Sequence, residues 1–483
     1  MIVTAEPRSV LILSTTPPLP RDYGNRNRVH QTVSLFRRMG FAVSFLLYPI
    51  DRDWAEEVPG YYRQLVESFD FFAIVPNSLK LHQNARGYHH GIDEWWDDNI
   101  AQQLTWLFQR KKFDVLFVNY TFFSKAFEYA PPGVVKVLDT HDLFSGRREL
   151  FAKFGVAPEF FYTSPERETA ALDRADAVIA IKQSEAVALR ALTARTVFSL
   201  PYWDDRSLDA RPARRELKPY DHDRPFRLGF LGAHNSVNIV NLRRFLSVFA
   251  RYVLLYDAPV EVIIAGNVSE GIPEDYPFAR KLGFLDDAAE FYRAIDAVLI
   301  PLEFSTGIKI KVAEALARNV PVLATRDAFD GFKAYHPTQH APTLHALCDI
   351  VVSAAYGDIP PHELAWATER SKLAAATAEE RGFKELRGWI DASLGPVVRA
   401  CRELLSCLDQ RSQELGPDEV VERARTLSRD DSYRPLAGQC AHQICRRLGY
   451  PIGSWGLSQK IFQPDFDLQG QIKWINQQVV VTR

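Results

Sequence analysis

The 483-residue chain has few of the features that mark secreted, membrane-spanning or nucleic-acid-binding proteins. It holds only five cysteines, too few for a disulfide framework in so long a chain. No run of about 18 apolar residues occurs, which argues against a membrane-spanning helix. The net charge of -2 provides no overall basic field for nucleic acid. No nucleic-acid partner is therefore expected, and any anionic ligand must be bound by local basic residues.

The first sixteen positions, Met1 to Thr16, contain one short apolar run and lack the regions of a signal peptide. We therefore expect a cytoplasmic protein, and peripheral contact with the inner face of a membrane is left open. Cys440, His442 and Cys445 match no common zinc spacing and have no evident fourth ligand. We interpret them as ordinary helix residues, and no bound metal is expected.

Hydrophobic residues make up 47% of the chain, which supports a fully globular protein. A chain of this length is too long for one ordinary core, so two domains and an extension are expected. The stretch from Gly283 to Gly331 has the most informative pattern of helices and strands in the sequence. It predicts a short helix at 288–295, a strand at 297–300, a second helix at 308–318 and a strand at 321–324.

The loop before the second helix has the chemistry of an anion site. Gly307 lets the backbone approach a ligand, and the free amides of a helix start attract negative oxygens. Lys309 and Lys311 place two cations in the first turn, where the helix dipole disfavours them unless an anion is present. Glu314, one turn further, can accept hydrogen bonds from the hydroxyls of a phosphate compound. The alternative is an amphipathic helix with solvated lysines and a Lys311–Glu314 pair.

Four motifs around this loop resemble, in order and spacing, the donor half of the family-four retaining glycosyltransferases. They lie at 283–287, 296–301, 305–317 and 321–325. The resemblance implies the GT-B architecture, an α/β fold in which two Rossmann-like, doubly wound domains face a central cleft. It also implies a nucleotide-diphosphate sugar as co-substrate, a UDP- or GDP-sugar, with no further cofactor.

The N-terminal region begins with a βαβ pattern, with strands at 9–15 and 42–48 around a helix at 28–39. Such a unit predicts a parallel sheet whose ligands lie at the carboxyl ends of the strands. The loop between the first strand and the helix resembles the family's glycine-containing loop with a basic residue. We therefore expect acceptor or phosphate contacts from Gly24, Asn25, Arg26 and Arg28.

A strand at 134–138 leads into Asp139, Thr140, His141 and Asp142. A histidine just past a strand end is well placed for the crevice. The resemblance assigns His141 as the catalytic-site residue that holds the donor sugar next to its reacting carbon, by positioning and hydrogen bonding.

The domain division follows from the patterns along the chain. We expect an acceptor-side domain at 1–205, a proline-rich linker at 206–225, a donor-binding domain at 226–395 and a mostly helical region at 396–483. The last region would hold a helix that crosses back to the first domain, and an extension of unknown role. The long helices predicted after Gly331 are 364–376 and 384–408.

The resemblance also assigns roles within the donor domain. Gly307, Lys309 and Lys311 would stabilise the leaving diphosphate, Glu314 would bind the ribose, and the backbone at 283–285 would contact the base. The full donor-binding set is Gly232, Asn235, Gly283, Phe284, Leu285, Thr306, Gly307, Lys309, Lys311 and Glu314.

Two departures from the family pattern leave the donor sugar and the activity open. Thr306 stands where many members carry a glutamate, and Ala233 and His234 replace an arginine and leave no lysine nearby. The chain is therefore either a transferase with altered donor contacts or a catalytically silent nucleotide-sugar-binding or scaffold protein. An epimerase would need carboxylates near the sugar, and a phosphorylase a pyridoxal lysine segment that is not seen. The acceptor is open among a glycan, a lipid-linked glycan, a protein and a small molecule.

Overall fold

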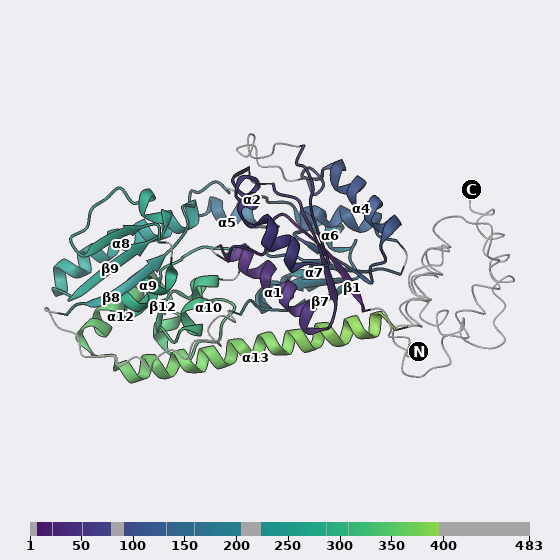
Figure 1. Cartoon of the computed structure of the whole chain (residues 1–483). Helices are drawn as coiled ribbons and strands as arrows, with labels where there is room; N and C mark the ends of the chain where they lie inside the picture. Colours follow the sequence, from purple (N-terminus) through teal and green to yellow (C-terminus); the bar gives the residue numbers. More distant parts are fainter. Residues whose placement is uncertain are drawn as a thin grey trace, which may run out of the picture.

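The computed structural model describes residues 7–21, 23–50, 52–78, 91–131, 133–158, 160–203, 224–285, 287–307 and 309–395. Each half of the chain forms a parallel sheet with helices packed on it, and one long helix, α13, runs along both halves (Figure 1). The expected pair of α/β domains is thus confirmed.

The N-terminal sheet has seven parallel strands in the order β3-β2-β1-β4-β5-β6-β7. The strand order reverses between β1 and β4, and ligands of such sheets bind outside the carboxyl ends of the strands at this point. The strands are β1 Ser9–Ser14, β2 Ala42–Leu47, β3 Phe71–Ile74, β4 Val115–Asn119, β5 Val135–Asp139, β6 Ala177–Ala180 and β7 Thr196–Ser199.

The helices of this domain connect the strands as parallel crossovers require. Helix α1 begins at Gly24, four residues before the predicted start, so the predicted Gly24 to Arg28 loop is the first turn of a helix. This first turn packs against the other domain, since a Cβ on Gly24 would lie 2.8 Å from Ile310 Cδ1. The helices are α1 Gly24–Arg38, α2 Arg52–Ser68, α4 Asp98–Arg110, η1 Thr121–Tyr129, α5 Arg147–Ala152, α6 Pro165–Leu172 and α7 Gln183–Leu192.

The C-terminal sheet has five parallel strands in the order β10-β9-β8-β11-β12. Its strands are β8 Phe226–Leu231, β9 Val260–Ala265, β10 Ala279–Gly283, β11 Ala297–Ile300 and β12 Val322–Ala324. Strand β10 was not predicted, because this edge strand is polar and partly exposed. The helices are α8 Ser236–Tyr256, η3 Asn267–Gly271, α9 Ala288–Ala294, α10 Ile310–Ala317, α11 Arg326–Phe329, η4 Pro337–Gln339 and α12 Leu344–Tyr356.

Helix α13, Pro361–Ser393, is a single helix of 33 residues. The predicted break between two helices, 364–376 and 384–408, is wrong because Gly382 does not interrupt α13, whereas residues 396–408 lie outside the described residues. A Cβ on Gly382 would overlap the carbonyl oxygen of Ser199, so glycine allows the helix to pack on β7. The helix contacts α10 of the donor domain as well.

The domain boundary predicted at 395/396 is therefore also wrong. Phe383, Leu386 and Ile390 of α13 pack into the core of the N-terminal domain, so the crossing lies before residue 396. The predicted extension from 396 to 483, including Cys440, lies outside the described residues, as does most of the linker at 206–225.

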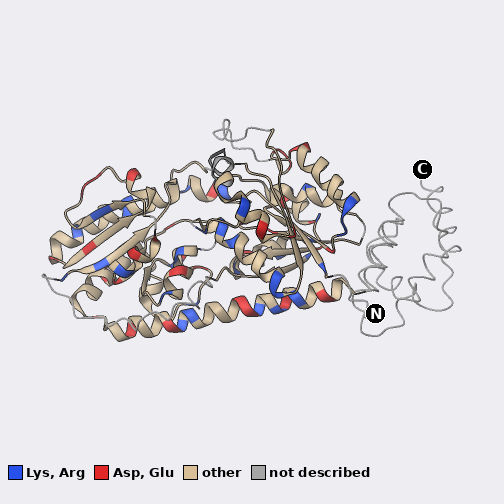
Figure 2. Ribbon diagram, viewed as in Figure 1, with Lys and Arg blue, Asp and Glu red and all other residues tan. Residues whose placement is uncertain are grey.

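Charges of both signs alternate along the exposed side of α13 (Figure 2). Two pairs lie one helical turn apart, with Lys384 Nζ 3.6 Å from Glu380 and Arg387 Nε 3.7 Å from Asp391. Among the helices that the structure describes, none is long and apolar enough to cross a bilayer.

Candidate functional site

The two domains meet where the carboxyl ends of their strands face each other. A Cβ on Gly307 of the donor-domain loop would lie 3.5 Å from the carbonyl oxygen of His141 in the N-terminal domain. Lys182 Nζ, at the end of β6, donates to Asp330 Oδ2 of the donor domain over 2.8 Å. The site is thus built from both halves of the chain.

His141 lies two residues beyond β5 and has a φ of 60°. Its Nε2 lies 2.6 Å from Asn119 Oδ1 at the end of β4, and its ring centroid lies 4.2 Å from that of Tyr120. Burial lowers the pKa of His141 to about 4, although the charge of Asp139 opposes this shift. The imidazole is therefore neutral at pH 7 and fixed in orientation. It can hydrogen-bond to a sugar, and its predicted role stays a prediction.

Arg28 does not contribute the phosphate or acceptor contact that we predicted. Its Nε and a terminal nitrogen donate to the two carboxylate oxygens of Asp139 at 2.9 and 3.1 Å, and Nη1 donates to Leu200 O over 2.8 Å. The side chain is 1% exposed. The prediction is wrong because Arg28 points inward from α1, where its bidentate bond holds Asp139 two residues before His141.

The other residues predicted in this segment also have structural contacts. Gly24 packs against Ile310, and Asn25 Nδ2 lies 3.5 Å from Thr16 Oγ1. Arg26 is fully buried, with its guanidinium carbon 5.1 Å from the centre of the Tyr23 ring. Arg26 thus lies inside the fold, and its predicted ligand contact stays a prediction.

Lys309 also differs from the prediction. It precedes the first turn of α10, and its Nζ donates to the carbonyl oxygens of Thr306 and Gly307 at 2.8 and 2.6 Å. Burial lowers the pKa of Lys309 to about 7, and the nearby charge of Lys182 adds to this effect. The ammonium satisfies carbonyl groups of its own loop, so here it fixes the loop rather than facing an anion.

Lys311, the second predicted cation, places its ammonium beside the start of α8. It lies in the first turn of α10 and is half-buried, with Nζ 3.0 Å from Asn238 Oδ1 and 4.3 Å from the centre of the Phe230 ring. Burial lowers its pKa to about 8, while the charge of Glu314 acts in the opposite direction. Asn238 in turn donates to Ala233 O over 2.9 Å. The ammonium therefore lies beside the segment after Gly232 that itself carries no arginine or lysine.

The remaining donor-side residues lie around this point. Asn235 caps α8, where its Oδ1 accepts from Asn238 N over 2.9 Å. Glu314 Oε2 accepts from the hydroxyl of Tyr292 over 3.1 Å, and Oε1 accepts from Asn27 Nδ2 of the other domain over 3.4 Å. The sequence did not single out Asn238 or Tyr292, because only the folded chain brings them to Lys311 and Glu314.

Gly283 ends β10 with a φ of 70°, a conformation that favours glycine. The next side chain, Phe284, is 65% exposed, and Leu285 is half-buried. An exposed aromatic ring beside a strand end can stack on a base. The predicted base contact of 283–285 stays a prediction.

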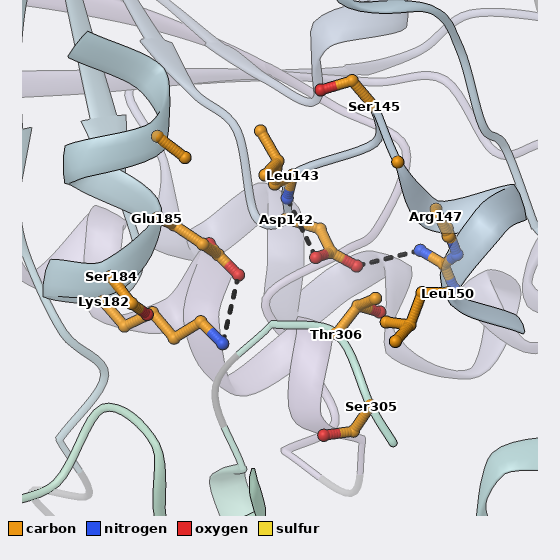
Figure 3. A pocket seen from close by; sticks show the side chains of 12 residues that line it. Asp142, Leu143, Ser145, Arg147, Leu150, Lys182, Ser184, Glu185, Ser305 and Thr306 are labelled. Carbon is orange, nitrogen blue, oxygen red and sulfur yellow. Dashed lines mark hydrogen bonds and ion pairs between the residues drawn. The ribbon is translucent and has the colours of Figure 1, made fainter. Parts of the chain in front are cut away.

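A pocket of about 290 Å³ opens between the domains beside Thr306 (Figure 3). Within it, Arg147 Nη1 donates to Asp142 Oδ2 over 2.8 Å, and Lys182 Nζ lies 3.6 Å from Glu185 Oε1. The lining residues are Asp142, Leu143, Ser145, Gly146, Arg147, Leu150, Lys182, Ser184, Glu185, Ala188, Ser305 and Thr306. The sequence did not single out Lys182 and Glu185, although both lie within five residues of the end of β6, the kind of position that selected His141.

In the part of the chain that the structure describes, no group of three or more histidine, cysteine, aspartate or glutamate side chains has the arrangement of a metal site. The arrangement offers a neutral histidine, a cation at a helix start and a carboxylate on the two domains that meet here. These groups suit binding of a phosphorylated compound with hydroxyl groups.

Comparisons with known proteins agree with this architecture. Residues 225–340 match the family model described as Glycosyl transferases group 1. No curated protein sequence matches the chain significantly. Among solved structures, TarM superposes with a TM-score of 0.53 at 10% identity, covering 80% of this chain and 98% of TarM.

Two further structures have known sources. HepE from Anabaena, solved with UDP, has a TM-score of 0.50 at 15% identity and covers 80% of this chain and 99% of its own. Sucrose-phosphate synthase from Thermosynechococcus elongatus has a TM-score of 0.51 at 13% identity, with 80% and 99% coverage. The chain thus has the GT-B fold, and the match over 225–340 supports glycosyl transfer.

Proposed function

We propose that the chain is a metal-independent retaining glycosyltransferase that moves a sugar from a nucleotide-diphosphate donor, a UDP- or GDP-sugar, to an acceptor hydroxyl. The observation that carries the proposal is the position of Lys311. Its ammonium lies 3.0 Å from Asn238 in the first turn of α8, so one cation and one helix start act on the same space. Together they suit a diphosphate.

In this proposal the protein supplies positioning and electrostatic stabilisation. Negative charge builds on the diphosphate as it leaves, and Lys311 with the first amides of α8 would stabilise that charge. Glu314 would accept hydrogen bonds from the ribose hydroxyls. His141, kept neutral by burial, would hydrogen-bond to the sugar beside the anomeric carbon. We place the reaction in the cytoplasm.

A panel of UDP-, GDP- and ADP-sugars tests the proposal, with binding followed by calorimetry and hydrolysis by release of free nucleotide. Selective binding with slow hydrolysis supports it. Lys311→Ala should weaken nucleotide binding by about 10- to 100-fold, because a charge-assisted contact contributes about 1.5–3 kcal/mol. Lys281→Ala is the control. Lys281 lies in β10, at one edge of the C-terminal sheet, and pairs with the exposed Asp275. Absence of nucleotide binding would refute the proposal.

The pH dependence of binding tests Lys311 separately. Its pKa of about 8 in the free protein would rise when an anion binds. The affinity for the nucleotide should therefore be constant below pH 8 and fall as the pH rises above 8. This fall in affinity above pH 8 should be absent in Lys311→Ala. An unchanged profile in the variant would show that another group binds the phosphate.

A second candidate is a nucleotide-binding protein without turnover. The observation that favours it is Lys309, whose ammonium is bonded to the carbonyl oxygens of its own loop and is 6% exposed. Selective binding with no hydrolysis and no transfer to any supplied acceptor would support this candidate.

A further inference from the structure

Glu185 is a buried carboxyl that the site described above does not use. It lies in the first turn of α7 and lines the pocket between the domains, where it points toward Asp142 and Thr306 (Figure 3). The residue is 5% exposed. Its Oε1 lies 3.6 Å from Lys182 Nζ, whereas Oε2 is buried with no hydrogen-bond partner among the described residues. Leaving such an oxygen unpaired destabilises the protein, so its presence needs an explanation.

The neighbours of Glu185 are held by other groups. Lys182 Nζ donates to Asp330 Oδ2 over 2.8 Å, and Lys309 donates to two carbonyl oxygens. Arg147 bonds to Asp142 over 2.8 Å, and its Nε is a second buried atom with no partner in the described part of the chain. Two residues that line the pocket therefore each hold one buried atom without a partner, an acceptor in Glu185 and a donor in Arg147. A compound with several hydroxyl groups can satisfy both, because each hydroxyl donates and accepts.

We propose that Glu185 binds a hydroxyl group of the donor sugar and that the pocket it lines selects an uncharged sugar. This inference rests on the proposed function. Ser305 and Thr306 continue the same pocket from the donor domain, and the adjacent Gly307 touches the backbone of His141. The pocket wall thus includes two residues of the loop that precedes Lys311 and Glu314, and we place the sugar end of the donor there.

The charges in the pocket exclude an acidic sugar. Arg147 is paired with Asp142, and Lys182 with Asp330 and Glu185. A sugar carboxylate would find no lining cation without a carboxylate beside it, and it would be repelled by Asp142. Burial and the charge of Asp142 raise the pKa of Glu185 to about 8, so Glu185 is mostly neutral at pH 7 and suits an uncharged partner. An uncharged hexose has no such cost, and its hydroxyl groups match the unpaired atoms.

The position of Glu185 also divides recognition between the two domains. The nucleotide contacts proposed for Lys311 and Glu314 belong to the donor domain, whereas Glu185 belongs to the opposite one. A change at Glu185 should therefore affect binding of the sugar and leave binding of the nucleotide alone unchanged.

Two variants of similar size test the proposal in the full-length protein. Glu185→Met fills the space without hydrogen bonds, and Glu185→Gln keeps both an acceptor and a donor. Each is assayed without acceptor, by affinity for UDP or GDP alone, by affinity for the corresponding uncharged hexose donors, and by hydrolysis rate. Glu379→Gln is the control, because Glu379 is a similarly buried carboxyl that lies on α13 away from the pocket.

We expect Glu185→Met to weaken binding of the sugar donor by about tenfold or more relative to the free nucleotide, with Glu185→Gln close to wild type. Glu185→Met should also raise the melting temperature, because it removes an unpaired buried oxygen. Lys182 keeps its ion pair with Asp330 in this variant. UDP-glucuronate should bind no better than UDP.

Other results overturn the inference. A Glu185→Met protein that is less stable but keeps its preference for the sugar donor would assign Glu185 a purely structural role. Tighter binding of UDP-glucuronate than of uncharged donors would refute the claim that the pocket selects an uncharged sugar. If the wild type binds nucleotides, either result refutes only this inference. If the wild type binds no nucleotide, the proposed function fails as well.

Discussion

At the scale of single residues, the bond between Arg28 and Asp139 is a fully buried ion pair in the N-terminal domain, with side chains 1% and 0% exposed. Arg28→Ala would leave a carboxylate buried without its partner. We expect the free energy of unfolding to fall by about 3–5 kcal/mol. Denaturant titration measures this change.

A matched control lies on the same helix. Arg38 pairs with Glu380 over 2.7 Å, but both side chains are more than 40% exposed. Solvent screens this pair, so Arg38→Ala should cost less than about 1 kcal/mol. Equal losses in the two variants would show that burial does not determine the strength of these pairs.

The sequence predicted the positions of some individual residues but not their contacts. The position of His141 could be predicted because the crevice lies where parallel strands end. The direction in which Arg28 and Lys309 point could not, because it depends on Asp139 and on carbonyl groups that only the fold brings close. Sequence pattern places a residue on an element, whereas its partners come from distant parts of the chain.

At the scale of the element, the two glycines of α13 have opposite surroundings. A Cβ at Gly382 would overlap Ser199 O, whereas a Cβ at Gly388 would meet no atom within 4 Å. Gly382→Ala should lower the free energy of unfolding by about 1–3 kcal/mol through overpacking. Gly388→Ala should raise it by about 0.5–1 kcal/mol through helix propensity.

Urea titration of both variants distinguishes a local clash from a general effect of glycine in the helix. If both substitutions were stabilising, the close approach of α13 to β7 would be wrong. Helicity measured by circular dichroism should stay unchanged in both variants, because neither substitution breaks the helix.

Most strands were predictable because their buried positions form short apolar runs, as in β8, β9 and β11. The start of α1 and the continuity of α13 were not. In both cases a glycine looks like a break in the sequence, and in both cases it packs closely against a distant chain segment, the side chain of Ile310 or the backbone of Ser199.

At the scale of the whole molecule, Asp330 links the two domains. Its Oδ2 accepts from Lys182 Nζ over 2.8 Å and from Ser184 Oγ over 2.9 Å. Because Asp330 is partly exposed, we expect Asp330→Ala to cost about 1 kcal/mol, a roughly fivefold shift toward separated domains.

Small-angle X-ray scattering of the nucleotide-free protein tests this expectation. The radius of gyration should increase in Asp330→Ala and return toward the wild-type value with a saturating donor. Asp275→Ala removes an exposed pair within one domain and should change nothing. An unchanged radius in Asp330→Ala would mean that other contacts alone hold the domains together.

The position of α13 has a consequence for how the protein is made. Phe383, Leu386 and Ile390 complete the core on one face of the N-terminal sheet, where α13 contacts β7, yet they are translated after the strands of both domains. Synthesis proceeds from the N-terminus. The apolar surface of the first domain that α13 covers therefore stays exposed until the second domain has been translated. Its final folding step therefore follows that of the donor domain.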